Sequence, residues 1–80
     1  MHKKTEQRIN KIFIKIFKID KKKINSNLSA KTFNKWDSLA HLNLILALEN
    51  EFKISFDIER VTTLMSYKLI MLELKSHGIK

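Results

Sequence analysis

The sequence predicts an all-α fold, a small four-helix bundle with a short third helix and a long loop between helices 1 and 2. Two observations favour it. The chain of 80 residues has no proline and one glycine, so it lacks the turn residues of strand-and-hairpin proteins. Its apolar residues recur mainly at helical spacing. A chain of this length is expected to form one domain, residues 1–80, around one core.

The first helix is predicted over residues 5–18, where apolar side chains recur at intervals of three and four residues. The members of this stripe are Ile9, Ile12, Phe13, Ile16 and Phe17. Ile12, Ile14 and Ile16 also alternate as in a strand, but the helical stripe has more members. We therefore expect an amphipathic helix whose apolar side faces the core.

A long loop is predicted over residues 21–37, where Asn, Ser and Lys surround scattered apolar residues. We expect Ile24, Leu28 and Phe33 to pack this loop against the core. A loop of this length in so small a domain is usually functional, so this segment is a candidate for more than a simple connection.

The second helix is predicted to begin at Asp37 or Ser38, because either side chain can accept a hydrogen bond from an amide of the first turn. Its apolar residues form a band that is wider than one stripe. They are Leu39, Leu42, Leu44, Ile45, Leu46, Ala47, Leu48 and Phe52. Such a helix lies in the middle of a bundle or presents apolar surface to a partner. The side expected to face the core contains Leu44, Ile45, Leu48 and Phe52.

A short third helix is predicted over residues 58–64. An extended link precedes it, in which Ile54 and Phe56 alternate with polar residues. Asp57 is a plausible cap for the first turn of this helix.

A fourth helix is predicted to follow Ser66, whose side chain is a plausible cap. Its apolar residues are Ile70, Met71 and Leu74. The helix is expected to end near His77, with Gly78 in the position after the helix that glycine favours.

The chain has a formal net charge of +8, and the positive charge is concentrated in its first part. Residues 1–35 contain eleven Lys or Arg and two Asp or Glu, whereas residues 36–80 contain five and six. Fourteen of the sixteen basic residues are lysine, which a biased composition or a solvated face explains as well as a ligand does. The alternative function is therefore a basic helical module that binds nucleic acid or anionic membrane through residues 1–35.

Composition also bears on the compartment. Cysteine is absent, so neither a disulfide framework nor a thiolate metal site is expected. The charged residues Lys3, Lys4, Glu6 and Arg8 have no uninterrupted apolar stretch behind them, unlike a secretory signal. No apolar segment approaches the roughly 20 residues that span a bilayer. We expect a cytoplasmic protein without a membrane span.

The sequence does not indicate an enzyme. Asp37, Ser38 and His41 are the residue types of a hydrolase triad, but they are too close along the chain and lack a glycine elbow. We expect His41 to be an exposed helix residue. Glu49 and Glu51 are two positions apart on a helix, so they point in different directions and do not form an acid–base pair.

Metal and phosphate sites are not indicated either. His2, His41 and His77 show no ligand spacing, and no glycine-rich phosphate loop is present. We expect neither a catalytic residue nor a metal ligand in this chain.

The segment DSLAHLNLILALENEFKISF, residues 37–56, resembles the acyl carrier protein family. In that family a D-S-L tripeptide opens the second helix, and an apolar run then ends in L-E-x-E-F before a short link and a short third helix. Here the same pattern is Asp37-Ser38-Leu39, then Leu48-Glu49-Asn50-Glu51-Phe52. The detailed match covers about residues 36–79, whereas residues 1–35 match only in layout.

The resemblance implies that Ser38 carries 4′-phosphopantetheine, which a phosphopantetheinyl transferase moves from coenzyme A onto its hydroxyl. The terminal thiol of this arm would hold acyl intermediates as thioesters for loading and acyl-transfer enzymes. The chain itself would be a non-catalytic monomer. A helix N-terminus suits the new phosphodiester anion, because it offers free amides and the positive end of a dipole. The competing interpretation of Ser38 is a plain N-cap.

The resemblance also implies a surface for partner enzymes around Ser38. The implied residues are Asp37, Leu39, Leu42, Leu46 and Glu49. The three leucines follow one side of the predicted helix, and core packing is the competing interpretation of their role.

Two features depart from the usual pattern of the family. Asn34-Lys35-Trp36 stands before D-S-L, where a glycine is usual, and a Trp there resembles carriers of specialised or surface-polymer pathways. Neutral residues also stand where acids are common, at Ala40, Asn43 and Asn50. Both departures favour a dedicated biosynthetic pathway over general fatty acid synthesis.

Overall fold

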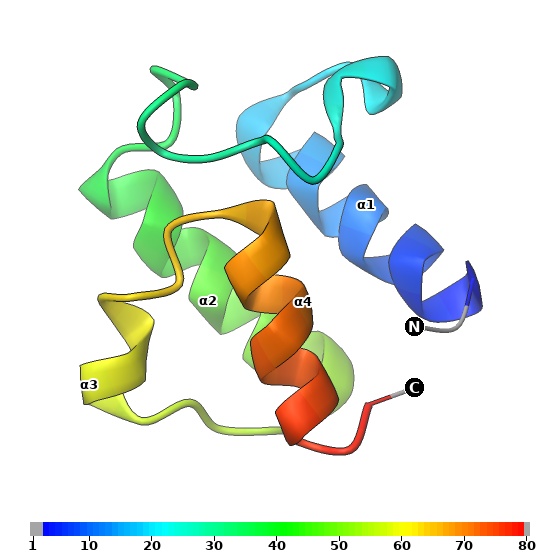
Figure 1. Ribbon diagram of the computed structural model, residues 1–80, viewed down its shortest axis with the longest axis vertical. Coiled ribbons are helices and arrows are strands. Elements are labelled where there is room, and N and C mark those ends of the chain that lie inside the picture. The colour runs from blue at the N-terminus through cyan, green and yellow to red at the C-terminus, as the bar shows by residue number, and fades with distance from the viewer. Residues whose placement is uncertain (1–2, 80) are drawn as a thin grey trace.

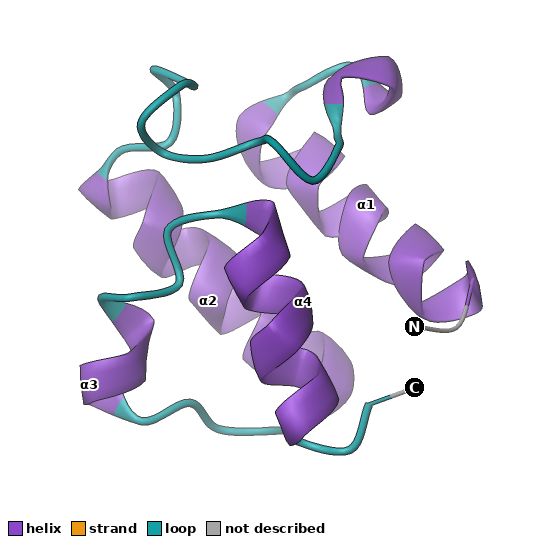
Figure 2. Cartoon of the chain, viewed as in Figure 1, coloured by secondary structure: helices purple, strands orange, loops and turns teal. Residues whose placement is uncertain are grey.

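The computed structural model describes residues 3–79, so His2 lies outside the described residues. Within them the chain forms four α-helices and one short 3-10 helix, with no strand (Figure 1, Figure 2). The elements are α1 (Lys3–Phe17), η1 (Lys21–Lys23), α2 (Ser38–Phe52), α3 (Ile58–Val61) and α4 (Tyr67–Ser76). The predicted all-α fold with a short third helix is confirmed.

α1 forms because its apolar residues share one side and its charged residues face water. Ile9, Phe13 and Phe17 are buried on the inner side. Lys18 then takes a left-handed conformation, with φ of 53°, and ends the helix. The helix begins two residues before the predicted start and ends one residue before the predicted end.

Three helices surround the core. α1 and α2 pack against each other and run in roughly opposite directions (Figure 1). α4 closes the core with its buried residues Ile70 and Leu74. Ser66 caps α4, because its hydroxyl accepts a 3.1 Å hydrogen bond from the amide of Leu69. Gly78 follows α4 with φ of 83°, as predicted.

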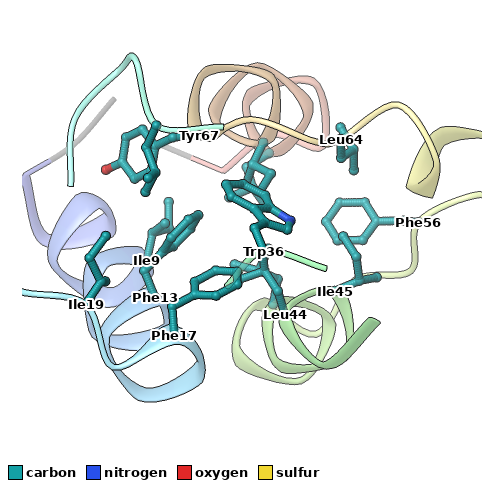
Figure 3. Close-up of a cluster of buried hydrophobic side chains, with 14 of the residues drawn as sticks. Ile9, Phe13, Phe17, Ile19, Trp36, Leu44, Ile45, Phe56, Leu64 and Tyr67 are labelled. Atoms are coloured by element: carbon teal, nitrogen blue, oxygen red, sulfur yellow. The ribbon is translucent and has the colours of Figure 1, made fainter. Parts of the chain in front are cut away.

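Aromatic side chains fill the centre of the core (Figure 3). Phe13 contacts Trp36 and Tyr67 edge-on, at centroid distances of 5.6 and 5.2 Å. Phe17 lies 5.2 Å from Trp36. Trp36 is therefore buried against α1, and its packing holds the chain just before Asp37 on the core.

The loop between α1 and α2 packs along the core, as predicted. Leu28 is buried, and Ile24 and Phe33 are half-buried. Two backbone hydrogen bonds of 2.9 Å also join the loop to the start of α4. The amide of Ala30 donates to the carbonyl of Met65, and the amide of Tyr67 donates to the carbonyl of Leu28. The loop contains η1, which no apolar period predicts because its three residues are all lysine.

α3 is shorter than predicted, since it ends at Val61 instead of residue 64. Thr62 and Thr63 use their hydroxyls to bond the carbonyls three residues before them, at 3.0 and 2.7 Å. These bonds compete with the continuation of the helix. Asp57 occupies the N-cap position, but its side chain makes no capping hydrogen bond, so the predicted cap is absent there.

Candidate functional site

The start of α2 is fixed by Asp37, which decides the choice of cap that the sequence leaves open. Its carboxylate Oδ1 accepts a 2.9 Å hydrogen bond from the amide of Ala40. Its backbone is extended, and its carbonyl accepts the first helical bond, from the amide of His41 at 2.8 Å. Asp37 is therefore the N-cap, and Ser38 is the first residue of the helix.

Ser38 is exposed to solvent, and its hydroxyl forms no hydrogen bond with any residue in the described range. The amides of Ser38 and Leu39 precede the first helical bond, so they have no partner within the helix. A negatively charged group on this hydroxyl would lie beside those amides and the positive end of the helix dipole. The geometry therefore suits a covalently attached anion.

His41 is buried, so the prediction that it is an exposed helix residue is wrong. The indole Nε1–H of Trp36 donates to its Nδ1 at 2.9 Å. Its Nε2 lies 2.7 Å from the carbonyl oxygen of Val61. Because an indole N–H only donates, Nδ1 accepts, and Nε2 carries the proton that it donates to Val61. With both nitrogens paired, the ring is buried without a large desolvation cost.

The position of His41 along the helix explains its burial. It precedes Leu44, Ile45 and Leu48 by three, four and seven residues, so it lies on the buried side of α2. Trp36 supplies the matching donor from the loop. A histidine that continues an apolar stripe is the sequence signal that predicts such burial.

A hydrolase triad does not form at this site. Both nitrogens of His41 are engaged by Trp36 and Val61, so neither is available to the serine hydroxyl. Asp37 caps α2 with its carboxylate instead of orienting an imidazole.

Three leucines of α2 lie on its exposed side, after Ser38. Leu39, Leu42 and Leu46 are 69%, 51% and 54% exposed. The opposite side of the helix is buried as predicted, and it contains Leu44, Ile45, Leu48 and Phe52. Core packing is thus not the role of the three exposed leucines, which we call the leucine row.

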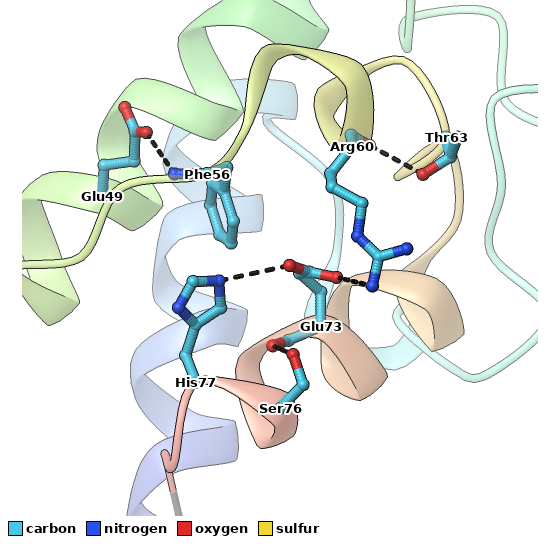
Figure 4. A network of polar contacts seen from close by, with 7 residues as sticks. All are labelled: Glu49, Phe56, Arg60, Thr63, Glu73, Ser76 and His77. Carbon is cyan, nitrogen blue, oxygen red and sulfur yellow. Dashed lines mark hydrogen bonds and ion pairs between the residues drawn. The ribbon is translucent and has the colours of Figure 1, made fainter.

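Glu49 and Glu51 act separately, as their spacing predicts. The Glu49 carboxylate is half-buried and accepts a 2.8 Å bond from the amide of Phe56, which fastens the link after α2 (Figure 4). The Glu51 carboxylate pairs with Arg8 of α1 at 2.6 Å. Among the residues expected to meet partners, Asp37 and the leucine row are exposed, whereas Glu49 is also engaged in the fold.

A polar network between α3 and α4 is not visible in the sequence pattern (Figure 4). Glu73 is buried, and its two carboxylate oxygens lie 3.1 Å from Arg60 and 3.2 Å from His77. His77 also packs edge-on against Phe56, at a centroid distance of 5.5 Å. These contacts hold the single turn of α3 against α4 and explain how so short a helix keeps its place.

Within residues 3–79, no group of three or more His, Cys, Asp or Glu side chains is placed to hold a metal ion. No helix in the same range has both the length and the apolar character needed to cross a bilayer. The features that stand out at the start of α2 are an exposed hydroxyl, a helix N-terminus and the leucine row.

Similarity to a known protein extends over most of the chain. No protein-family model matches it. A curated protein from Mycoplasma genitalium, described as "Acyl carrier protein homolog", is 40% identical over 74 residues. The aligned part covers 84% of this chain and 88% of that relative. Together with the four-helix fold, this similarity shows that the chain belongs to the acyl carrier protein family.

Proposed function

We propose that this chain is a carrier whose Ser38 hydroxyl holds 4′-phosphopantetheine, with acyl groups attached to the terminal thiol as thioesters. In the loading step, the Ser38 oxygen attacks the phosphorus next to pantetheine in coenzyme A. A new oxygen–phosphorus bond forms, the diphosphate bond breaks, and adenosine bisphosphate leaves. The phosphopantetheinyl transferase takes the serine proton, since both nitrogens of His41 are engaged by Trp36 and Val61.

The observation that carries this proposal is the state of Ser38. Its hydroxyl is exposed and unbonded, while its neighbour Asp37 caps the helix. The hydroxyl therefore contributes nothing to the fold that a modification would remove. The attached phosphodiester gains about 0.3–1 kcal/mol from an exposed helix N-terminus. The chain acts as a non-catalytic carrier, and the partner enzymes supply the catalysis.

The proposed surface for loading and acyl-transfer enzymes is the leucine row, with Asp37 at its start. Exposed apolar side chains that follow one another on a helix are typical of a contact surface. Glu49 belongs to the same proposal, although one of its carboxylate oxygens is bonded to Phe56. The proposal treats the chain as one monomeric domain, since an uncovered α2 is what these enzymes need.

We further propose a dedicated pathway, because the exposed side of α2 is poor in free acids. Asn43 and Asn50 are exposed and neutral, and Glu51 is paired with Arg8. Enzymes that select an acidic carrier would therefore bind this one slowly. Rapid loading by acyl-transfer enzymes of general fatty acid synthesis, with normal kinetics, would contradict the dedicated pathway. A cytoplasmic location completes the proposal, because the thiol of the arm stays free in a reducing compartment.

Intact-mass measurement tests the attachment. The purified chain is incubated with coenzyme A, magnesium and a promiscuous phosphopantetheinyl transferase. The mass is expected to rise by one phosphopantetheine, and Ser38→Ala is expected to abolish the gain. Ser55→Ala removes another exposed serine and is the matched control, which should load like the natural chain. An unmodified mass under conditions that load a control carrier, or loading of Ser38→Ala, would contradict the proposal.

A stability measurement separates loss of attachment from loss of fold. Ser38→Ala is expected to change the free energy of unfolding by no more than about 0.5 kcal/mol, because the hydroxyl has no partner. Asp37→Ala is expected to cost about 1 kcal/mol, because it removes the cap. Urea denaturation of the two variants distinguishes the attachment residue from the structural one.

A further inference from the structure

Six exposed lysines are concentrated within residues 11–23, in α1, just after it and in η1. This group, which we call the lysine face, consists of Lys11, Lys15, Lys18, Lys21, Lys22 and Lys23. Lys11 and Lys15 are four residues apart and share one exposed side of α1, whereas Lys18 follows the helix in a left-handed conformation. η1 follows the end of α1 after three residues (Figure 1).

The ammonium groups of the lysine face have no acidic partner in the described part of the chain. The one acid within residues 11–23 is Asp20, and its carboxylate accepts a 3.1 Å bond from the backbone amide of Lys22, which caps η1. Arg8 differs, since it pairs with Glu51. Uncompensated like charges repel one another, so the fold gains nothing from this cluster.

A biased composition alone does not account for this placement. It would spread lysine evenly along the chain, but residues 1–35 hold eleven of the sixteen Lys and Arg and only two of the eight acids. The segregation of charge, and the exposure of all six side chains, indicate a surface that meets an anionic partner.

Nucleic acid is the weaker candidate for that partner. Proteins that bind single strands or base edges use exposed aromatic rings and free arginines. The aromatic rings within residues 11–23, Phe13 and Phe17, are buried in the core. Arg8, the one arginine of residues 3–35, is held by Glu51. The lysine face therefore offers charge without the groups that read bases.

We propose that the lysine face binds the surface of an anionic lipid bilayer. Clusters of about four to eight basic residues bind acidic headgroups electrostatically. Ile14, which is 37% exposed, lies three residues after Lys11, on a neighbouring position of the same helix surface. An exposed apolar side chain among lysines suits the lipid interface, where lysine stems lie along apolar surface and their charges reach water. The chain lies on the bilayer through this face.

Sedimentation with vesicles tests the proposal on the full chain. Vesicles of phosphatidylglycerol and phosphatidylcholine are expected to bind the chain, whereas vesicles of phosphatidylcholine alone are not. Binding is expected to weaken as salt rises to about 0.15 M, because salt screens exposed charges. The triple variant Lys11→Gln, Lys15→Gln, Lys18→Gln is expected to bind about 100-fold more weakly, at about five-fold for each lysine.

A matched control has the same change of net charge at other positions. It replaces three exposed lysines outside the lysine face, by Lys53→Gln, Lys68→Gln and Lys75→Gln. This variant is expected to bind within about three-fold of the natural chain, because the attraction falls off within a Debye length. Equal losses in the two triple variants would overturn the proposal, since binding would then follow net charge alone.

Two further measurements complete the test. Tighter binding to duplex DNA or single-stranded RNA than to the acidic vesicles, at the same salt, would also overturn the proposal. Ser38→Ala is expected to keep vesicle binding although it can no longer gain the mass of phosphopantetheine. Failure of membrane binding and failure of arm attachment can therefore be told apart. Circular dichroism checks that the triple variants fold, which is expected because every replaced side chain is exposed.

Discussion

At the scale of a single residue, His41 connects three parts of the chain. It belongs to α2, it accepts the indole N–H of Trp36 from the loop, and it donates to the carbonyl of Val61 in α3. Its ring also stacks on the indole, at a centroid distance of 6.1 Å. Such buried hydrogen bonds matter to the fold mainly because a donor or acceptor left unpaired in the core would raise the free energy of the folded state.

Replacement of His41 by leucine is expected to lower the free energy of unfolding by about 2 kcal/mol, because a buried indole N–H and a carbonyl lose their partner. Urea denaturation measures the loss. Asn43→Leu, at an exposed position of the same helix, is the control and is expected to change stability by no more than about 0.5 kcal/mol. Similar effects of the two substitutions would mean that the hydrogen bonds of His41 contribute little to the free energy of unfolding.

At the scale of the elements, Tyr67 ties α4 to α1 across the core. Its hydroxyl donates a 2.7 Å bond to Oδ1 of Asn10, and its ring packs edge-on against Phe13. Burial, and then the negative charge of Glu6, raise the pKa of Tyr67 to about 12. Both causes disfavour the phenolate, so the contact between the two helices depends on the protonated side chain.

The stability of the fold is expected to decline through Tyr67 as the pH rises from about 10 to about 12. The unfolded chain loses the phenol proton near pH 10.0, whereas the folded chain keeps it up to about pH 12. The contribution of Tyr67 to the free energy of unfolding is therefore fully present below about pH 10 and is lost progressively between about pH 10 and about pH 12. Tyr67 is the one tyrosine of the chain, so tyrosinate absorbance reports its ionisation. A midpoint near pH 10 in the folded protein would refute the shift, and Tyr67→Phe should remove this part of the decline.

Element boundaries follow from the sequence where local signals agree. The starts of α2 and α4 are predictable, because Asp37 and Ser66 cap them and an apolar period follows each. The end of α3 is not, because the hydroxyls of Thr62 and Thr63 turn back onto the chain just where the apolar pattern continues to residue 64.

The candidate site shows the same division between local and distant information. Spacing along one helix places the leucine row on one side of α2 and the start of the helix at Asp37 or Ser38, and the structure shows that this side is exposed and that Asp37 is the cap. The burial of His41 depends on a tryptophan outside that helix and on a carbonyl 20 residues away. The pairing of Glu51 with Arg8 spans 43 residues, so no local pattern predicts it.

At the scale of the whole molecule, the two proposed surfaces lie on different elements. The leucine row follows Ser38 along α2, whereas the lysine face lies on the end of α1 and in η1. An enzyme that contacts α2 and a bilayer that contacts α1 would therefore use different side chains. The net charge of +8 arises in residues 1–35, which bear the lysine face and have eleven basic and two acidic residues, whereas residues 36–80 have five and six.

This uneven charge predicts how the fold responds to salt. Unpaired lysines repel one another in the folded chain, and the Debye length falls from about 30 Å to about 8 Å between 0.01 M and 0.15 M salt. The melting temperature is therefore expected to rise by about 4 °C over that range, which corresponds to somewhat less than 1 kcal/mol for a domain of this size. Thermal melts followed by circular dichroism in sodium chloride measure it. The variant Lys11→Gln, Lys15→Gln, Lys18→Gln should show a smaller rise in melting temperature. A melting temperature that falls as salt rises would contradict the prediction, because attractive ion pairs such as Arg8–Glu51 would then outweigh the repulsion between lysines.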